Sequence, residues 1–220
     1  MFLQSVGNVA PAGALYVVAG GGNDARDALV AAASSPTPFA VIRAAAMAYA
    51  QSIGTIVEQL QAAGAQHTVV WDVPDLGLAP AVTEMGAGAS LLGTRVSRVM
   101  NRFRSRQLDG EAGVSIFDVF ALQNDIVADP ASFGLVNVTD ACGAPSEQCD
   151  PATALYWDGI HPTAAGHALL AQGMLVAAVP EPSEVVLMLS GFVFVATWRI
   201  GARRPRCDAR RRPEATGADG

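Results

Sequence analysis

Between residues 14 and 126, short apolar runs alternate with longer amphipathic stretches, and this alternation restricts the folds open to the chain. A short apolar run bounded by turn residues indicates a buried strand, whereas apolar residues spaced three and four apart indicate a helix. The predicted strands span residues 14–20, 66–73 and 114–120, and the predicted helices span 39–61 and 89–107. Strands that alternate with helices form βαβ units, in which the strands are parallel. We therefore predict an α/β fold with a parallel sheet.

The predicted helix over residues 39–61 has its apolar side chains on one face, as in a helix packed against a core. The residues of this face are Ile42, Tyr49, Ile53, Ile56 and Leu60, and Gly64 is the expected C-cap. After Asp129 the sequence is irregular until Thr163, which is expected to N-cap a last helix that runs to about Val179.

Polar clusters follow the first two predicted strands. They are GGGND at residues 20–24 and DVPDLGLAP at residues 72–80. Ligand sites of parallel sheets lie beyond the carboxyl ends of the strands. Both clusters are therefore candidates for a functional site.

The stretch YWDGIHPTAAGH, residues 156–167, contains two of the three histidines of the chain. Asp158 and His161 are three residues apart, and Pro162 favours an extended backbone at His161. A carboxylate at this spacing can accept a hydrogen bond from His Nδ1 and leave Nε2 free to act as a base. The same spacing also suits a helix N-cap or an ion pair on the surface.

Asn23, in the glycine-rich cluster, offers amide donors that could point at a developing oxyanion. The glycines before it allow a ligand to approach the backbone closely. The alternative is a strand-to-helix turn in which Asn23 or Asp24 caps a helix that begins near Ala25. The spacing fits neither a dinucleotide fingerprint nor a P-loop.

The charge of the chain is unevenly distributed. Residues 1–198 carry seventeen acidic residues against seven arginines, a net charge of −10, and this argues against a nucleic-acid-binding surface. Cys142 and Cys149 lie seven residues apart, so they either close a small disulfide loop or remain two thiols. No histidine or further cysteine lies near enough to complete a metal site, and we expect no metal.

The last forty residues differ from the rest. An apolar run over residues 185–198 follows the stretch VPEPSE, and seven arginines follow the run. The run is short for a membrane span. An apolar segment followed at once by arginines nevertheless suits an inserted segment whose C-terminus stays in the cytoplasm. The alternative is an ordinary terminal helix.

Taken together, the segments around Asn23 and His161 resemble the SGNH hydrolases, also called GDSL esterases or lipases. The stretches VWDVPDLGLAP (70–80) and VSIFDVFALQNDIVADPASFGLVNVTDAC (114–142) are similar to that family too, so that the resemblance covers about residues 10–178. It implies a flavodoxin-like three-layer sandwich and a hydrolase that acts on an ester, a lipid or an acylated carbohydrate without a cofactor. It also implies that His161 is the general base, that Asp158 orients it, and that Asn23, with Gly21, forms the oxyanion hole.

The sequence departs from this family at its start. The family's nucleophilic serine lies in an N-terminal Gly-Asp-Ser block on the first strand, and Ser5 in LQSVGNV does not resemble that block. The resemblance therefore implies an N-terminally truncated domain that is inactive as given, in which the strand at 14–20 becomes an exposed apolar edge. The alternative is a non-catalytic extracellular surface or matrix protein that retains the fold.

The C-terminal segment resembles the PEP-CTERM sorting signal, which an exosortase of Gram-negative bacteria recognises and cleaves. This implies a hydrolase domain over residues 1–178, a sorting segment with a hydrophobic helix over 179–204 and a disordered basic tail over 205–220. It also implies that the protein is exported to the cell surface or extracellular matrix, with residues 185–198 only transiently in the inner membrane. A Cys142–Cys149 disulfide becomes plausible in that compartment, whereas Cys207 is removed. The alternative is a permanent anchor.

Overall fold

The structure is a computed structural model that describes residues 2–145 and 149–178. The expected sorting segment over 179–204 and basic tail over 205–220 lie outside the described residues.

Three parallel strands form the sheet, as the alternation of the sequence predicts. They are β1 (Leu15–Val18), β2 (His67–Trp71) and β3 (Val114–Phe117), in the order β1-β2-β3. Val17 of β1 lies beside Val69 of β2, and Val70 lies beside Ile116 of β3. The central strand is buried on both faces, because Val69 and Val70 point to opposite sides and are exposed by no more than 1%.

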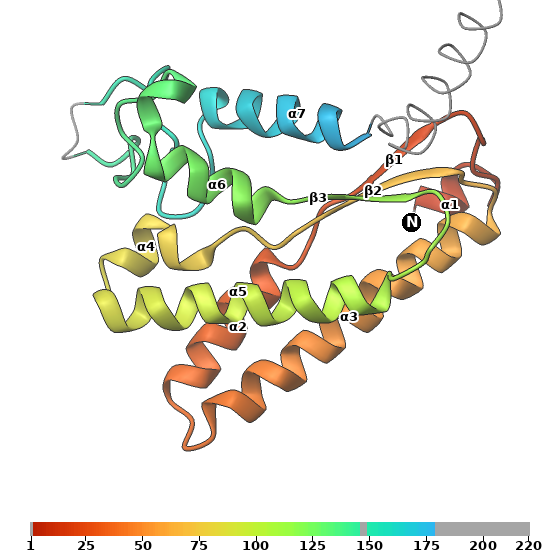
Figure 1. Cartoon of the computed structure of the whole chain (residues 1–220), viewed down its shortest axis with the longest axis horizontal. Helices are drawn as coiled ribbons and strands as arrows, with labels where there is room; N and C mark the ends of the chain where they lie inside the picture. The colour runs from red at the N-terminus through yellow and green to blue at the C-terminus, as the bar shows by residue number, and fades with distance from the viewer. Residues whose placement is uncertain (1, 146–148, 179–220) are drawn as a thin grey trace, which may run out of the picture. The chain divides into compact units, whose positions relative to one another are not determined.

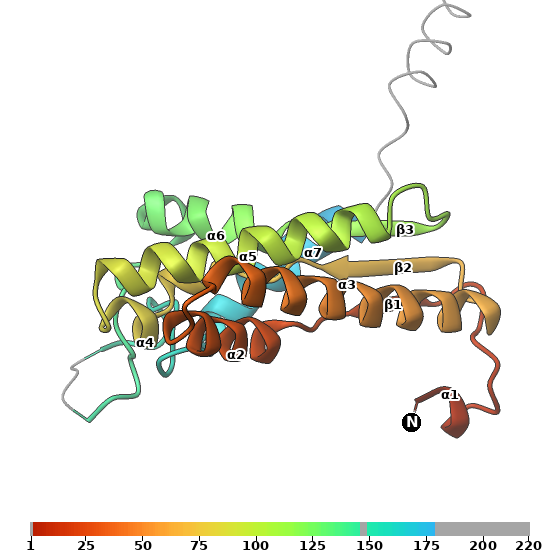
Figure 2. The same ribbon diagram turned by 90° about the horizontal axis from the view of Figure 1, so that it is seen from below.

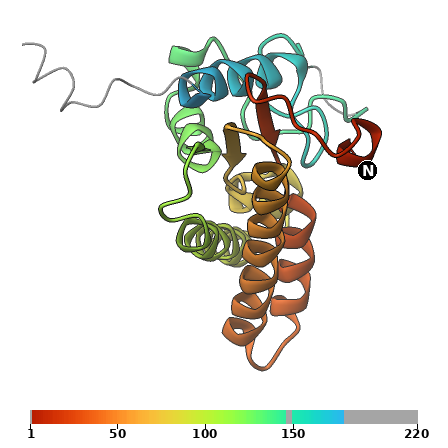
Figure 3. The ribbon, with the colours of Figure 1, turned by 90° about the vertical axis from the view of Figure 1, so that its right-hand side faces the viewer.

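Helices cover both faces of this sheet and produce three layers (Figures 1, 2 and 3). One layer contains α2 (Gly22–Ala33), α3 (Pro38–Ala62) and α5 (Ala87–Gln107), which pack against one another. The other contains α7 (Ala164–Ala178), which contacts β2 and β3, together with α6 (Val119–Ala128). Connections of this kind place the loops after β1 and β2 at the same edge of the sheet.

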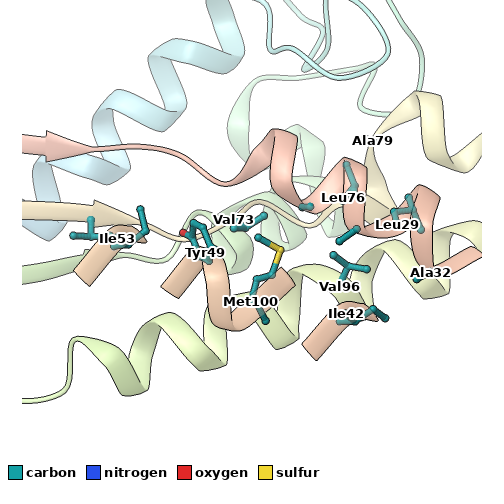
Figure 4. Close-up of a cluster of buried hydrophobic side chains, with 14 of the residues drawn as sticks. Leu29, Ala32, Ile42, Tyr49, Ile53, Val73, Leu76, Ala79, Val96 and Met100 are labelled. Atoms are coloured by element: carbon teal, nitrogen blue, oxygen red, sulfur yellow. The ribbon is translucent and has the colours of Figure 1, made fainter. Parts of the chain in front are cut away.

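The largest cluster of buried side chains lies between the sheet and the layer formed by α2, α3 and α5 (Figure 4). The buried face of α3 consists of Ile42, Ala46, Tyr49, Ala50, Ile53, Gly54, Val57 and Leu60. The prediction is right for most of this face but wrong for Ile56, which is 40% exposed. Val57 occupies the buried position instead, because it lies four residues after Ile53 and therefore on the same face of the helix.

Helix α3 also has the length and hydropathy of a membrane span, and it is the one such helix among residues 2–145 and 149–178. Its buried side chains belong to the core cluster that includes Val70 of the sheet and Met100 of α5. A core helix meets the same criteria of length and composition as a membrane span. The packing of α3 identifies it as a core helix.

Several boundaries differ from the prediction. Strand β3 ends at Phe117, because the Asp118 carboxylate accepts a hydrogen bond from the Ala121 N–H and starts α6 at Val119. Helix α2 begins at Gly22, three residues before the expected start. The short elements α1 (Phe2–Ser5), η1 (Leu76–Leu78), α4 (Pro80–Thr83) and η2 (Pro130–Phe133) were not predicted, since one turn of helix leaves little periodic signal.

Strand β1 forms one edge of the described sheet. Its Leu15 and Val17 side chains are 43% and 45% exposed, although both are apolar. The side chains of Tyr16 and Val18 pack against Leu60 of α3 and Ala65. An apolar edge strand with unpaired backbone groups is a surface on which further strands can add.

Candidate active site

Asp158 and His161 form a hydrogen-bonded pair in the turn before α7. The Asp158 Oδ2 atom lies 2.8 Å from His161 Nδ1, and Oδ1 accepts hydrogen bonds from the backbone N–H groups of Ile160 and His161 at 2.8 and 2.7 Å. A bridge between Tyr156 and Pro162 and the bond from the Trp157 N–H to the His161 carbonyl close the turn. The backbone therefore holds the carboxylate against the ring.

The structure excludes the helix-cap alternative for Asp158. The Thr163 hydroxyl accepts the bond from the Gly166 N–H, so Thr163 caps α7 as predicted. His161 and Asp158 are 74% and 51% exposed at their side chains, and His161 Nε2 has no hydrogen-bond partner in the part of the chain that the structure describes. An Nδ1–H donated to the carboxylate leaves the Nε2 lone pair free to accept a proton.

The backbone N–H of His161, its imidazole and the Ile160 N–H lower the pKa of Asp158 from 3.8 to about 2, against the opposing effect of partial burial. A carboxyl group whose pKa is lower in the folded state stabilises the fold above pH 3.8, and this contribution disappears as the pH falls toward 2. The effect on stability is small, since the side chain is half exposed. Asp158 therefore stays ionised at any pH at which His161 can act as a base.

We predict that the carboxyl carbon of Asp158 titrates with a midpoint near pH 2 in an NMR pH titration. His161→Ala should move the midpoint toward 3.8, because the imidazole bond is lost, but only in part, because two backbone N–H groups still donate. His167→Ala is the matched control and should leave the midpoint unchanged. A midpoint near 3.8 in the unsubstituted protein would contradict the geometry of the turn.

A buried hydrogen-bond network fixes this turn to the loop after β2. Gln123 of α6 donates from Nε2 to the Tyr156 hydroxyl at 2.6 Å and to the Asp75 carbonyl at 3.2 Å, and its Oε1 accepts from the Asp75 N–H. Burial raises the pKa of Tyr156 to about 12, so its hydroxyl remains protonated. The Gly159 carbonyl also accepts from the Ala81 N–H at 3.0 Å, which ties the turn to α4.

Asp75, which the sequence placed among the polar candidates, has a structural role. Its Oδ1 accepts from the Gly77 N–H and from the Thr94 hydroxyl, and its Oδ2 accepts from the Asn124 amide. Asp75 is 2% exposed, and its side chain caps η1. All its recorded bonds are internal, so the carboxylate is committed to holding the loop.

Gly21 turns the chain from β1 into α2. Its φ of 94° is left-handed, and a Cβ at this position would meet Tyr49 Cε2 at 2.5 Å and Val73 Cγ2 at 2.8 Å. Only glycine combines this backbone with so close an approach. Figure 4 shows Tyr49 and Val73 lying together under this part of the fold.

Asn23 lies in the first turn of α2 and is exposed. No side chain caps this helix, which contradicts the alternative that Asn23 or Asp24 does so. The Asn23 amide makes no hydrogen bond within residues 2–145 and 149–178, so its donors are free for a ligand. Its position at a helix N-terminus also favours negative charge nearby.

The candidate groups lie beyond the carboxyl ends of the strands. Asn23 follows β1, and the turn of Asp158 and His161 is held against α4, which follows β2. The carboxyl ends of parallel strands meet at the same edge. No recorded hydrogen bond joins Asn23 to either residue of the pair among the described residues. Ser5, in α1, lies toward the opposite end of the domain, near the start of β1 (Figures 1 and 2).

Sequence reasoning missed a buried ion pair at this edge. Arg104 of α5 is 2% exposed and bonds through Nη2 to Asp72, directly after β2. Burial lowers the pKa of Arg104 and raises that of Tyr49, to about 12. The Tyr49 hydroxyl and the Arg104 Nε and Nη1 atoms are buried without partners among the described residues. An arginine on an amphipathic helix carries no sequence signal that separates burial from exposure.

A disulfide joins Cys142 and Cys149, whose Cα atoms lie 5.2 Å apart. The Cys142 and Gly143 N–H groups donate to the carbonyls of Tyr156 and Trp157 at 3.0 and 2.6 Å. The loop therefore pairs with the segment that leads into the Asp158 turn. Across the described ranges, no three His, Cys, Asp or Glu side chains gather in an arrangement that could hold a metal ion.

A parallel α/β domain that holds an Asp–His pair and a free asparagine amide at the carboxyl ends of its strands has groups that can accept a proton and donate hydrogen bonds to an anion. The comparison with family models identifies the class of protein. The chain belongs to the family described as GDSL-like Lipase/Acylhydrolase, whose model matches residues 2–174.

Longer proteins are similar to the chain. A Pseudomonas putida protein, described only by its place in the trpE–trpG intergenic region, is 34% identical over 80% of this chain and 30% of its own length. Esterase EstA of Pseudomonas aeruginosa is 31% identical over 56% of this chain and 21% of its own length. A GDSL esterase/lipase of Arabidopsis thaliana is 26% identical over 58% of this chain and 42% of its own length. The chain thus spans less than a third of the two bacterial relatives.

Proposed function

We propose that this domain hydrolyses carboxylic esters with His161 as the general base. The observation that carries the proposal is the 2.8 Å contact between His161 Nδ1 and Asp158, which leaves an exposed Nε2 without a partner among the described residues. A serine hydroxyl would attack the ester carbonyl while Nε2 accepts its proton. The proton would then pass to the leaving alcohol, and water would release the acyl group in a second, equivalent step.

In this proposal the oxyanion is stabilised by the glycine-rich turn. The Asn23 amide supplies one donor, and Gly21 shapes the backbone so that the turn can approach the substrate. The esterase names of two relatives support an ester, lipid or acylated carbohydrate as the substrate class.

We further propose that the nucleophilic serine comes from polypeptide outside residues 1–220. The support is that no hydroxyl of the described residues is bonded to His161 Nε2 and that Ser5 donates to the Phe2 carbonyl within α1. Residues 1–220 alone are then inactive, and the Asp–His pair completes an active site only in the presence of that segment. A non-catalytic surface protein is the second candidate, because no hydroxyl group among the described residues is bonded to His161.

Reading the codons upstream of Met1 in frame, and expressing the chain with and without them, tests the proposal. We expect the extended polypeptide to hydrolyse p-nitrophenyl butyrate and to be labelled on a serine by a fluorophosphonate. Residues 1–220 should show neither property, since the base has no hydroxyl to activate. An extended polypeptide that folds but lacks both properties would favour the non-catalytic protein.

Export and sorting through the C-terminal segment are also part of the proposal. The support is the sequence of residues 179–204, with its apolar run and the arginines that follow, and the Cys142–Cys149 disulfide, which suits an oxidising compartment. An exosortase would then cleave the chain, and residues 185–198 would occupy the inner membrane only transiently.

We predict that the intact mass of the form recovered from the cell surface corresponds to a chain that ends near Pro182. Cleavage should remove the apolar run together with all seven arginines after it. Retention of residues 199–220 in the surface form would indicate a permanent anchor instead. The same measurement on cells that lack the processing activity provides the uncleaved reference.

A further inference from the structure

A cavity of about 220 Å³ lies behind the turn that holds Asp158 and His161. Its walls come from the carboxyl end of β2, from α6 and α7, and from the turn itself, and they are almost entirely apolar. They include Trp71, Ile126, Leu155, Ile160, Pro162 and Leu170. Among the polar groups in the wall, the Tyr156 hydroxyl bonds to Gln123, and the Asp75 carboxylate bonds to Gly77, Thr94 and Asn124. The indole N–H of Trp71 and the ring of His167 have no hydrogen-bond partner among the described residues.

The cavity is placed beside the proposed base. Ile160 and Pro162, which flank His161 in the sequence, both line it. Ile160 is also 42% exposed, so one wall of the cavity extends to the protein surface in the turn of the Asp–His pair. A chain whose polar end lay near His161 could therefore pass along Ile160 and enter the cavity.

The size and chemistry of the cavity select an aliphatic ligand. Protein interiors contain few voids larger than a water molecule, and an apolar cavity of roughly 150 Å³ stays dry and takes up benzene. This cavity is larger and lacks an unpaired charged side chain deep in its wall. A hydrocarbon chain matches it, whereas a sugar ring would leave most of its hydroxyl groups without partners.

We propose that this cavity binds the acyl chain of the ester substrate, with the scissile carbonyl left outside near His161. This proposal rests on the proposed ester hydrolysis. It implies that the cavity selects the substrate by its acyl chain. Because α6, α7 and the β2 loop enclose the cavity, it takes short and medium chains and excludes the end of a long one. The polar headgroup of the substrate stays in solvent.

Octanoate binding to residues 1–220 tests the cavity without any turnover. The indole N–H of Trp71 is buried without a partner among the described residues, so its NMR signal, assigned with Trp71→Phe, reports on the cavity. We expect octanoate to shift this signal saturably. Leu170→Phe, which fills the cavity, should weaken binding at least tenfold, whereas Leu91→Phe, on the exposed surface of α5, should leave it unchanged.

If Leu170→Phe does not fold, Ile160→Phe at the partly exposed wall replaces it, with the same expected loss. Equal binding by a folded cavity-filling variant, or shifts confined to the exposed Trp157, would overturn the proposal. The extended polypeptide separates the two proposals. Ester hydrolysis without octanoate binding would refute the cavity alone, whereas octanoate binding without hydrolysis would refute the esterase and leave the cavity as an aliphatic-chain site.

Discussion

Arg104→Met is expected to lower the free energy of unfolding by about 3–5 kcal/mol, which is the usual cost of removing one partner of a buried ion pair. Arg104 is 2% exposed and bonds to Asp72, whose side chain is 9% exposed. Methionine fills much of the arginine's volume but leaves the Asp72 carboxylate buried and unpaired. Since domains of this size are stable by about 5–15 kcal/mol, the variant should unfold at much lower urea concentration.

The matched control is Arg102→Met, which removes an exposed arginine two residues earlier on α5 and should change stability by less than about 0.5 kcal/mol. The double variant Arg104→Met/Asp72→Leu removes both charges and should recover most of the loss, because an apolar pair often replaces a buried ion pair without cost. Urea unfolding followed by circular dichroism measures all three. A loss under 1 kcal/mol for Arg104→Met would show that water reaches Asp72.

His161→Ala, made in the upstream-extended polypeptide, is expected to lower kcat for ester hydrolysis on the order of 10⁴- to 10⁶-fold, as in serine hydrolases that lose the base. The imidazole is the group that accepts the serine proton in the proposed mechanism, and no other histidine lies in the turn. The side chain is 74% exposed, so its removal should leave the urea midpoint nearly unchanged. Activity and stability should therefore separate in this variant.

His67→Ala provides the control for this substitution. His67 is exposed at the first residue of β2, at the edge of the sheet opposite to the Asp158 turn. His67→Ala should leave kcat within about twofold of the value for the unsubstituted polypeptide, as is usual for a surface substitution away from the site. An active His161→Ala protein would show that another group accepts the proton, and the role proposed for the Asp–His pair would be wrong.

Much of the fold could be predicted because it depends on regular patterns. The three strands, the helices α3, α5 and α7 and the parallel sheet follow from the alternation of periods along the chain. Errors occur where a single side chain decides a boundary, as Asp118 does at the start of α6. They also occur where one turn of helix replaces a predicted loop, as in η1.

The candidate site also has parts that the sequence could predict and parts that it could not. The bond between Asp158 and His161 joins residues three apart, and the Thr163 cap joins residues three apart as well, so both could be anticipated from the sequence. The role of Asn23 could not be settled in this way, because its sequence suits a cap as well as a free amide. The structure excludes the cap, because α2 begins without a side-chain cap, and the oxyanion role of Asn23 stays a proposal.

By itself, the sequence determined the three strands, the long helices α3, α5 and α7 and the local Asp158–His161 contact, because all of them depend on residues within a few positions of one another. The tertiary structure alone decided that Arg104 is buried against Asp72, that Gln123 holds Tyr156, and that an apolar cavity lies behind His161. These features join residues about thirty or more positions apart. Their energies come from desolvation and packing, which exist only once α5, α6 and α7 have docked on the sheet.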